Sequence, residues 1–159
     1  MSVNVEQVVV ESGDDELLEA AWDLKERIRQ DQGVLRQKRG FFTRAYRRAT
    51  TYAYIDREGD SLIGFASVRR DGYILFLAVA PEDRGEGFGQ RLVATVAEEH
   101  RRVTCHARTT NEDALGFYEA LGFERVRRID NYYEDGGAAY YLRLGEGGLT
   151  DRLTDLFRR

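Results

Sequence analysis

The chain has 159 residues, a formal net charge of −4 at pH 7, 42% hydrophobic residues and one cysteine. This length is typical of one domain with a sizeable core, and one cysteine excludes an internal disulfide. The acidic charge argues against a nucleic-acid partner, while apolar runs too short to span a membrane and a start unlike a signal peptide predict an unsecreted, cytoplasmic protein.

The first 48 residues predict one strand and two helices. We expect the strand over residues 3–11 and an Arg-rich second helix over residues 35–48. Between them, apolar residues recur at helical spacing behind a candidate N-cap at Ser12, and Gly33 is expected near the end of this first helix. The recurring residues are Leu17, Ala21, Leu24 and Ile28.

The middle of the chain predicts three consecutive strands, joined by short turns and therefore antiparallel. They cover residues 51–56, 62–68 and 73–80. The third is apolar on both faces, as expected for a central strand that is covered on both sides. It leads directly into a glycine-rich turn.

The remaining elements follow in a regular order. A helix is expected over 89–100, a strand over 102–108, a helix from Asn111 to about Leu121 and a long hairpin over 123–144. Asn111 suits the N-cap of its helix and Gly122 the position just after its end. We predict one domain over residues 1–145, followed by an amphipathic C-terminal helix over residues 146–159.

The glycine-rich turn is Arg84-Gly85-Glu86-Gly87-Phe88-Gly89, at the start of a helix. Its glycines permit a tight backbone turn around an anion. The first helical turn would aim its unpaired N–H groups and the positive end of the helix dipole at that anion. Arg84 can add a charge-assisted contact. No Gly-Lys-Ser/Thr follows, and the turn comes too late for a Rossmann fingerprint.

With the preceding Val79-Ala80-Pro81, this turn resembles the signature of the GCN5-related N-acetyltransferase family. A second block, from Arg108 to Phe123, is similar to the family's Asn-x-x-Ala-x-x-x-Tyr-x-x-x-Gly-Phe segment. The resemblance covers roughly residues 50–144. It implies an α+β fold with a mostly antiparallel central sheet of six to seven strands, flanked by helices and splayed between the fourth and fifth strands.

The resemblance further implies that acetyl-CoA is bound, with its pyrophosphate on the glycine turn and its pantetheine arm beside the main chain near Val79. Glu86 departs from the basic residue that is common in the family, and a carboxylate there is unfavourable unless it points to solvent. The expected contacts are Leu77, Ala78, Val79, Arg84, Gly85, Glu86, Gly87, Phe88, Gly89, Gln90, Asn111 and Tyr118. No metal is expected.

Acetyl transfer needs a neutral amine and an acid for the departing thiolate. Tyr118 matches the family's acid position, although its spacing also suits a core aromatic residue. The third strand has no carboxylate to act as base. His106, which titrates near neutral pH, and Tyr73, which resembles a tyrosine that shares the base role in eukaryotic relatives, are the substitutes. Each also has a purely structural interpretation, and a bridging water is a third candidate for the base.

The acceptor is expected to be a protein or peptide N-terminus. An α-amine is roughly 10% neutral at pH 7 and a lysine only about 0.04%, a difference of about 3 to 4 kcal/mol that a weak base cannot easily supply. Tyr132 and Tyr133 resemble the tyrosine pair with which N-terminal acetyltransferases contact the peptide, and could equally be ordinary strand aromatics. The alternatives are a small-amine acetyltransferase and a non-catalytic acyl-CoA-binding module. The protein could be a monomer or a homodimer.

Overall fold

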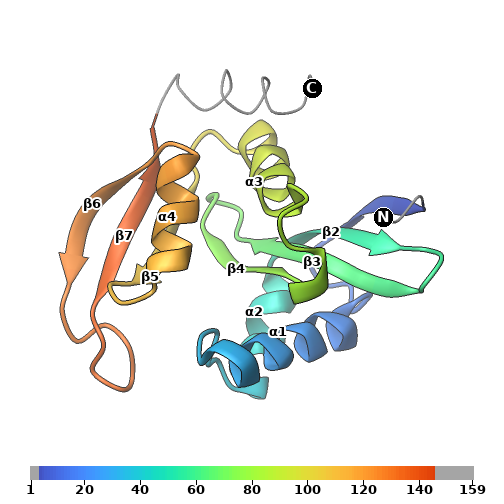
Figure 1. The fold of residues 1–159 in the computed structure, drawn as a ribbon, viewed down its shortest axis with the longest axis horizontal. Coiled ribbons are helices and arrows are strands. Elements are labelled where there is room, and N and C mark those ends of the chain that lie inside the picture. The colour runs from blue at the N-terminus through green and yellow to red at the C-terminus, as the bar shows by residue number, and fades with distance from the viewer. Residues whose placement is uncertain (1–3, 146–159) are drawn as a thin grey trace.

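The computed structural model describes residues 4–145, which form four α-helices around two antiparallel sheets (Figure 1). The elements in chain order are β1 Val5–Val10, α1 Leu18–Gln32, α2 Arg39–Arg48, β2 Thr50–Asp56, β3 Ser61–Val68, β4 Ile74–Val79, a 3-10 turn Pro81–Asp83, α3 Phe88–Glu99, β5 Thr104–Arg108, α4 Glu112–Ala120, β6 Phe123–Ile129 and β7 Ala139–Leu144. The expected order of helices and strands is confirmed. The expected C-terminal helix, residues 146–159, lies outside the described residues.

The strands form a four-stranded sheet in the order β1-β2-β3-β4 and a three-stranded sheet in the order β5-β7-β6. The two sheets meet at a single parallel bridge between Tyr73 and Thr104, just before β4 and at the start of β5. The Thr104 amide also donates to the Gly72 carbonyl at 3.1 Å. From this junction β4 and β5 diverge, which confirms the expected separation between the fourth and fifth strands (Figure 1).

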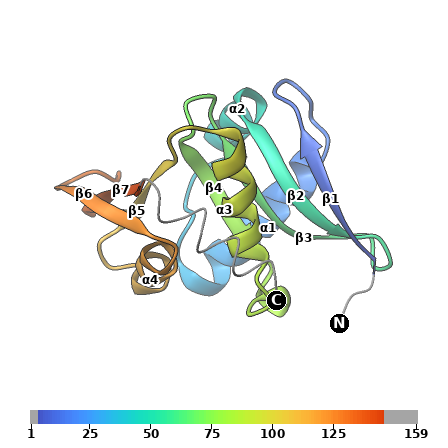
Figure 2. The same cartoon turned by 90° about the horizontal axis from the view of Figure 1, so that it is seen from above.

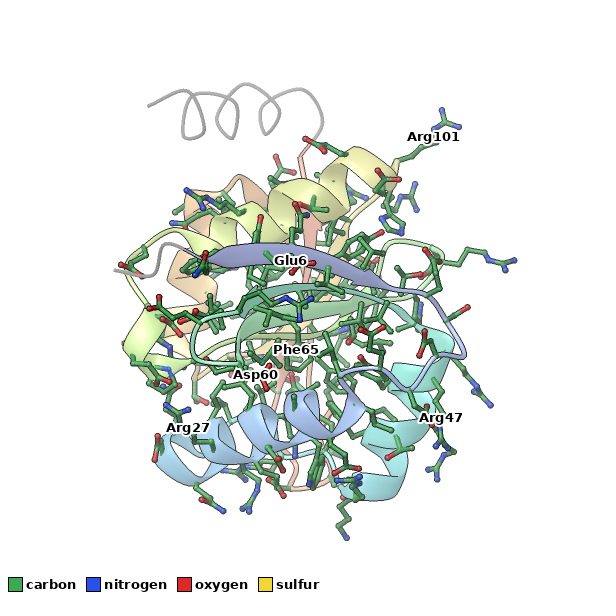
Figure 3. All side chains as sticks on the ribbon, turned by 90° about the vertical axis from the view of Figure 1, so that its right-hand side faces the viewer. Glu6, Arg27, Arg47, Asp60, Phe65 and Arg101 are labelled. Atoms are coloured by element: carbon green, nitrogen blue, oxygen red, sulfur yellow. The ribbon has the colours of Figure 1, made fainter. Side chains whose placement is uncertain are left out.

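Helices cover the four-stranded sheet on both faces, so the molecule has two apolar layers (Figures 1 and 2). One layer lies between this sheet and α1 and α2, and it includes Phe42, Phe65 and Phe76. Figure 3 shows Phe65 between the sheet and α1. The other layer lies under α3 and α4 and includes Leu92 and Tyr118. The double coverage explains why β4 is apolar on both of its faces.

Three local expectations are corrected. Ser12 is not the N-cap of α1, because this helix begins after Leu17, which has a left-handed backbone with φ of 66° and no side-chain capping bond. The second helix begins at Arg39 instead of residue 35, and β5 begins at Thr104 instead of residue 102. Helix and strand ends depend on backbone hydrogen bonds, which periodicity does not show.

A buried lysine of α1, Lys25, holds the loop between α1 and α2. Lys25 has no exposed surface, and its ammonium donates a hydrogen bond to the Gln37 carbonyl and lies 4.6 Å from the centre of the Trp22 ring. Burial lowers the pKa of Lys25. Because a buried ammonium needs partners, these contacts fix the course of the loop that leads into α2.

Candidate active site

The glycine turn between β4 and α3 has the backbone that an anion-binding turn requires. Gly85 and Gly87 have φ of 84° and 88°, which L side chains rarely adopt. Gly87 is the N-cap of α3 and offers no side-chain bond, so the first amides of α3 have no capping partner. Gly89 has a different role, because an added Cβ would lie 3.0 Å from the Phe117 ring on α4. This glycine lets the two helices approach.

The side chains around this turn are mostly acidic. Glu86 is exposed to solvent, which satisfies the condition under which a carboxylate is tolerated there. Burial raises the pKa of Asp83, with further contributions from Glu82 and Glu86. Arg84 donates from Nε to the Val79 carbonyl at 3.3 Å. The turn therefore has to hold an anion mainly through backbone amides and Arg84.

The open edge of β4 lies beside this turn. The Ala80 amide donates to the Ile63 carbonyl of the neighbouring β3 strand at 2.7 Å. Since main-chain groups alternate along a strand, those of Ala78 also point to β3, whereas those of Leu77 and Val79 point toward the gap with β5. An extended ligand can therefore pair with Leu77 and Val79. Ala78 instead packs its side chain into the layer under α1 and α2.

The last expected contacts with acetyl-CoA come from α3 and α4. Phe88 is buried and packs against Tyr54, with 5.4 Å between ring centres, while Gln90 is half-buried in the first turn of α3. The Asn111 side chain accepts a hydrogen bond from the Ala114 amide at 3.1 Å, which confirms that it caps α4. A contact of Asn111 with acetyl-CoA stays a prediction.

Tyr118 projects from α4 into the apolar layer beside β5 and is only 7% exposed. Its ring packs edge-on against Phe123, with 5.0 Å between ring centres. Burial raises the pKa of Tyr118 and, to about 12, that of the neighbouring Cys105 thiol. Both groups therefore keep their protons at neutral pH, so Tyr118 is available as a proton donor and Cys105 is not a thiolate nucleophile.

His106 lies on the opposite face of β5 from Cys105, as strand alternation predicts. Its Nδ1 is 2.6 Å from the Tyr73 hydroxyl, which reaches it from the start of β4. Burial lowers the pKa of His106, and the positive charges of Arg127 and Arg69 lower it further. The structure thus brings together Tyr73 and His106, the two residues that sequence reasoning offered for the base.

Tyr132 and Tyr133 follow β6 and lie on this same side of the molecule. Tyr132 stacks on the His106 ring with 4.4 Å between ring centres and 14° between planes. Tyr133 packs edge-on against Tyr132 and lies under the guanidinium of Arg108, 4.0 Å from its ring centre. Tyr132, Tyr133 and His106 therefore pack together and form what we call the tyrosine wall.

Ion pairs of one aspartate, Asp135, join segments that are far apart in the sequence, near Tyr133 and His106. Asp135, between β6 and β7, contacts Arg36 at 2.8 Å and Arg108 at 3.1 Å. Arg36 belongs to the loop between α1 and α2. The loop between α1 and α2 and the connection between β6 and β7 are thereby held together.

The site thus has two halves on opposite sides of the sheets. The glycine turn and Tyr118 belong to the side covered by α3 and α4, whereas His106 and its tyrosines lie on the side of α1 and α2. Between the two halves, β4 and β5 diverge (Figure 1).

Sequence reasoning could not place three residues that the structure brings near His106. Tyr141 of β7 is 5.0 Å from His106 between ring centres, and the guanidinium carbon of Arg127 is 4.9 Å from the Tyr141 ring centre. Arg69 lies over the Tyr73 ring at 4.6 Å. Only strand pairing reveals these contacts, since Arg-Arg pairs on predicted strands give no indication of which arginine faces a site.

One hollow in the described part of the chain lies away from the expected site residues. A surface hollow of about 840 Å³ lies between β1, β2 and α3, and none of the expected site residues lines it. Within residues 4–145, no group of three or more His, Cys, Asp or Glu side chains has an arrangement suited to a metal ion. No helix in that part of the chain combines the length and apolar character needed to cross a bilayer.

Residues 15–123 match the acetyltransferase (GNAT) family, and the chain belongs to this family. It is 34% identical over 101 residues to N-alpha-acetyltransferase RimI of Mycobacterium tuberculosis. The aligned region covers 57% of this chain and 64% of that protein. It is 28% identical over 102 residues to N-alpha-acetyltransferase 30 of Schizosaccharomyces pombe, covering 56% of this chain and 68% of that one. An uncharacterised Mycobacterium leprae protein, ML0378, is matched over only 26% of its length.

Solved structures share the fold over most of the chain. The ribosomal-protein-S18-alanine N-acetyltransferase of Escherichia coli superposes with a TM-score of 0.68 at 22% identity, covering 89% of this chain and 98% of that one. Arabidopsis thaliana Naa50, in complex with the bisubstrate analogue CoA-Ac-MVNAL, gives a TM-score of 0.64 at 25% identity, over 90% and 99% of the two chains. The expected α+β fold of this family is confirmed.

Proposed function

We propose that this protein transfers the acetyl group of acetyl-CoA to the α-amine of a protein or peptide N-terminus by direct attack. The observation that carries the proposal is the pairing of Tyr73 with His106 on the face of β5 opposite the apolar layer that holds Tyr118. The relatives named N-alpha-acetyltransferase support the same reaction. The cytoplasm, where a lone buried cysteine stays reduced, is the compartment we propose.

The donor half of the site fits acetyl-CoA. The pyrophosphate would lie on the turn from Arg84 to Gly89, where two glycines have positive φ and the start of α3 has no side-chain cap. The pantetheine amides would pair with Leu77 and Val79, whose main-chain groups point into the gap. Bound acetyl-CoA supplies the thioester that the amine attacks.

Tyr73 and His106 would remove the proton from the acceptor amine. Burial raises the pKa of Tyr73, whereas that of His106 is lowered, so at neutral pH the proton stays on the phenol and Nδ1 accepts it in a hydrogen bond. The Tyr73 oxygen can then receive a proton from the amine, directly or through one water, while its own proton moves to Nδ1. Net positive charge near His106 also disfavours a bound ammonium.

Tyr118 would supply the proton on the donor side. Its raised pKa keeps the hydroxyl protonated in the resting enzyme, ready to hydrogen-bond a developing thiolate. Its place in the apolar layer excludes water from that bond. On the acceptor side, Tyr132 and Tyr133 would orient the first residues of the peptide.

Acetylation assays test this proposal most directly. The purified chain is supplied with acetyl-CoA and a panel of N-terminal peptides, internal-lysine peptides and small amines, and release of free thiol is followed. We expect peptide-dependent release that falls by about 100-fold or more in Tyr118→Phe and in His106→Ala, in line with the usual contribution of acid–base groups. Arg143→Gln, on the exposed side of β7, is a control.

The alternatives give different results. Release with small amines but not with peptides would identify a small-amine acetyltransferase of the same family. Binding of acetyl-CoA without release on any acceptor would favour an acyl-CoA-binding module. Activity that is unchanged in both Tyr118→Phe and His106→Ala would refute the assignment of these residues, whatever the acceptor.

A further inference from the structure

Arg127 occupies a defined place on the acceptor side. In the three-stranded sheet, His106 of β5 pairs directly with Tyr141 of β7, and Tyr141 pairs directly with Arg127 of β6. The three side chains form one row across the sheet, with the Arg127 guanidinium carbon 4.9 Å from the Tyr141 ring centre. This contact orients the guanidinium next to His106 without fixing its hydrogen-bonding groups.

Arg127 differs from the other arginines of β6 in its partners. Arg125 pairs with Glu119 at 2.6 Å, and Arg128 pairs with Asp130 at 2.8 Å. Arg127 makes no ion pair with any carboxylate within residues 4–145. Within these residues, no carboxylate therefore competes with a ligand for its five N–H donors.

The two cations that lie over the other tyrosine rings each have a carboxylate partner. Arg69, over the Tyr73 ring, pairs with Asp71 at 2.6 Å, and Arg108, over the Tyr133 ring, pairs with Asp135 at 3.1 Å. Arg127 differs from Arg69 and Arg108 in having no carboxylate partner within residues 4–145. A carboxylate on the acceptor would pair with Arg127 as Asp71 pairs with Arg69 and Asp135 pairs with Arg108.

We infer that Arg127 selects acceptors that carry a carboxylate side chain on their second or third residue, an inference that rests on the proposed function. Tyr141 lies 5.0 Å from the His106 ring and 4.9 Å from the Arg127 guanidinium carbon. A peptide of two or three extended residues, at about 3.3–3.6 Å each, spans such a row. An amine beside His106 and Tyr73 therefore places the side chain of its second or third residue near Arg127.

The test compares matched peptides that carry Asp, Asn or Lys at position 2 or position 3. For the wild-type protein we expect kcat/KM about three- to tenfold higher for Asp than for Asn, lower again for Lys, and a smaller preference at high salt. Arg127→Gln should abolish the preference, and Arg127→Glu should reverse it in favour of Lys. Thermal unfolding of each variant establishes that it is folded.

Arg125→Gln is the matched control. Arg125 is on the same strand and its guanidinium also lies over a tyrosine ring, that of Tyr140 at 4.4 Å, but it pairs with Glu119 of α4 on the opposite face. Its removal should leave the charge preference unchanged. Equal loss of the preference in Arg125→Gln and Arg127→Gln would point to the overall charge of the protein and overturn the inference.

A binding measurement separates this inference from the proposed function. The same peptides are titrated into the protein without acetyl-CoA, and their dissociation constants are compared. Tighter binding of the Asp peptides that is lost in Arg127→Gln supports the inference even where no acetyl transfer occurs. Efficient transfer with no dependence on peptide charge overturns the inference and leaves the proposed function standing. If the peptides show neither binding nor acetyl transfer, both the inference and the proposed function are overturned.

Discussion

Gly72 joins the two sheets, and Gly72→Ala tests whether this junction sets the active-site geometry. Gly72 has φ of 85°, and an added Cβ would lie 1.7 Å from the Arg102 carbonyl oxygen, which is far inside contact distance. That carbonyl belongs to the backbone leading into β5, so it cannot rotate away as a side chain would. The substitution has to push β5 away from β4.

The magnitude follows from two contributions. A left-handed backbone destabilises alanine by roughly 1–2 kcal/mol, and overpacking in a tight contact adds about 1–3 kcal/mol. Gly13→Ala isolates the first contribution, because Gly13 has φ of 89° and nothing within 4 Å of an added Cβ. For a domain of this size, the second contribution corresponds to a melting temperature roughly 2–12 °C lower for Gly72→Ala than for Gly13→Ala.

The assay combines thermal unfolding with acetyl transfer at a temperature where both variants are folded. Because the Tyr73 hydroxyl and His106 Nδ1 are 2.6 Å apart across this junction, a shift of β5 by about 1 Å should lower kcat/KM by about 100-fold in Gly72→Ala. Gly13→Ala should keep wild-type activity. Equal melting temperatures and equal activities for the two variants would refute the role given to the junction.

Three further predictions concern protonation and charge. By NMR titration, the pKa of His106 should lie below the ordinary histidine value of about 6.5. Arg127→Gln should raise the pKa of His106, because it removes a positive neighbour that disfavours the imidazolium. A pKa that does not rise in Arg127→Gln would contradict the proximity of Arg127 and His106. With its pKa raised to about 12 by burial, Cys105 should react with iodoacetamide at pH 8 roughly 1000-fold more slowly in the folded protein than in urea, and equal rates would disprove its burial. Glu86→Gln should tighten acetyl-CoA binding about two- to fivefold at low salt, measured by calorimetry, with Glu124→Gln as control; an unchanged affinity in Glu86→Gln would place the pyrophosphate elsewhere.

Local sequence determined the parts of the site that depend on one turn or one strand. The positive φ of Gly85 and Gly87 and the capping of α4 by Asn111 follow from residue chemistry within a few positions. Strand alternation alone placed His106 on the face opposite Cys105, because side chains along a strand have a period of two. The order of the elements was likewise predictable from hydrophobic periodicity.

Only the tertiary structure decided which of these elements meet. β7 lies between β5 and β6, which aligns His106, Tyr141 and Arg127 although they come from three separate segments. Asp135 reaches Arg36 across 99 positions of sequence. Periodicity reports which face of an element is buried but not the neighbour that buries it. Strand order and loop contacts are set by packing of the whole chain. The charged residues around His106 could therefore be identified only in the folded structure.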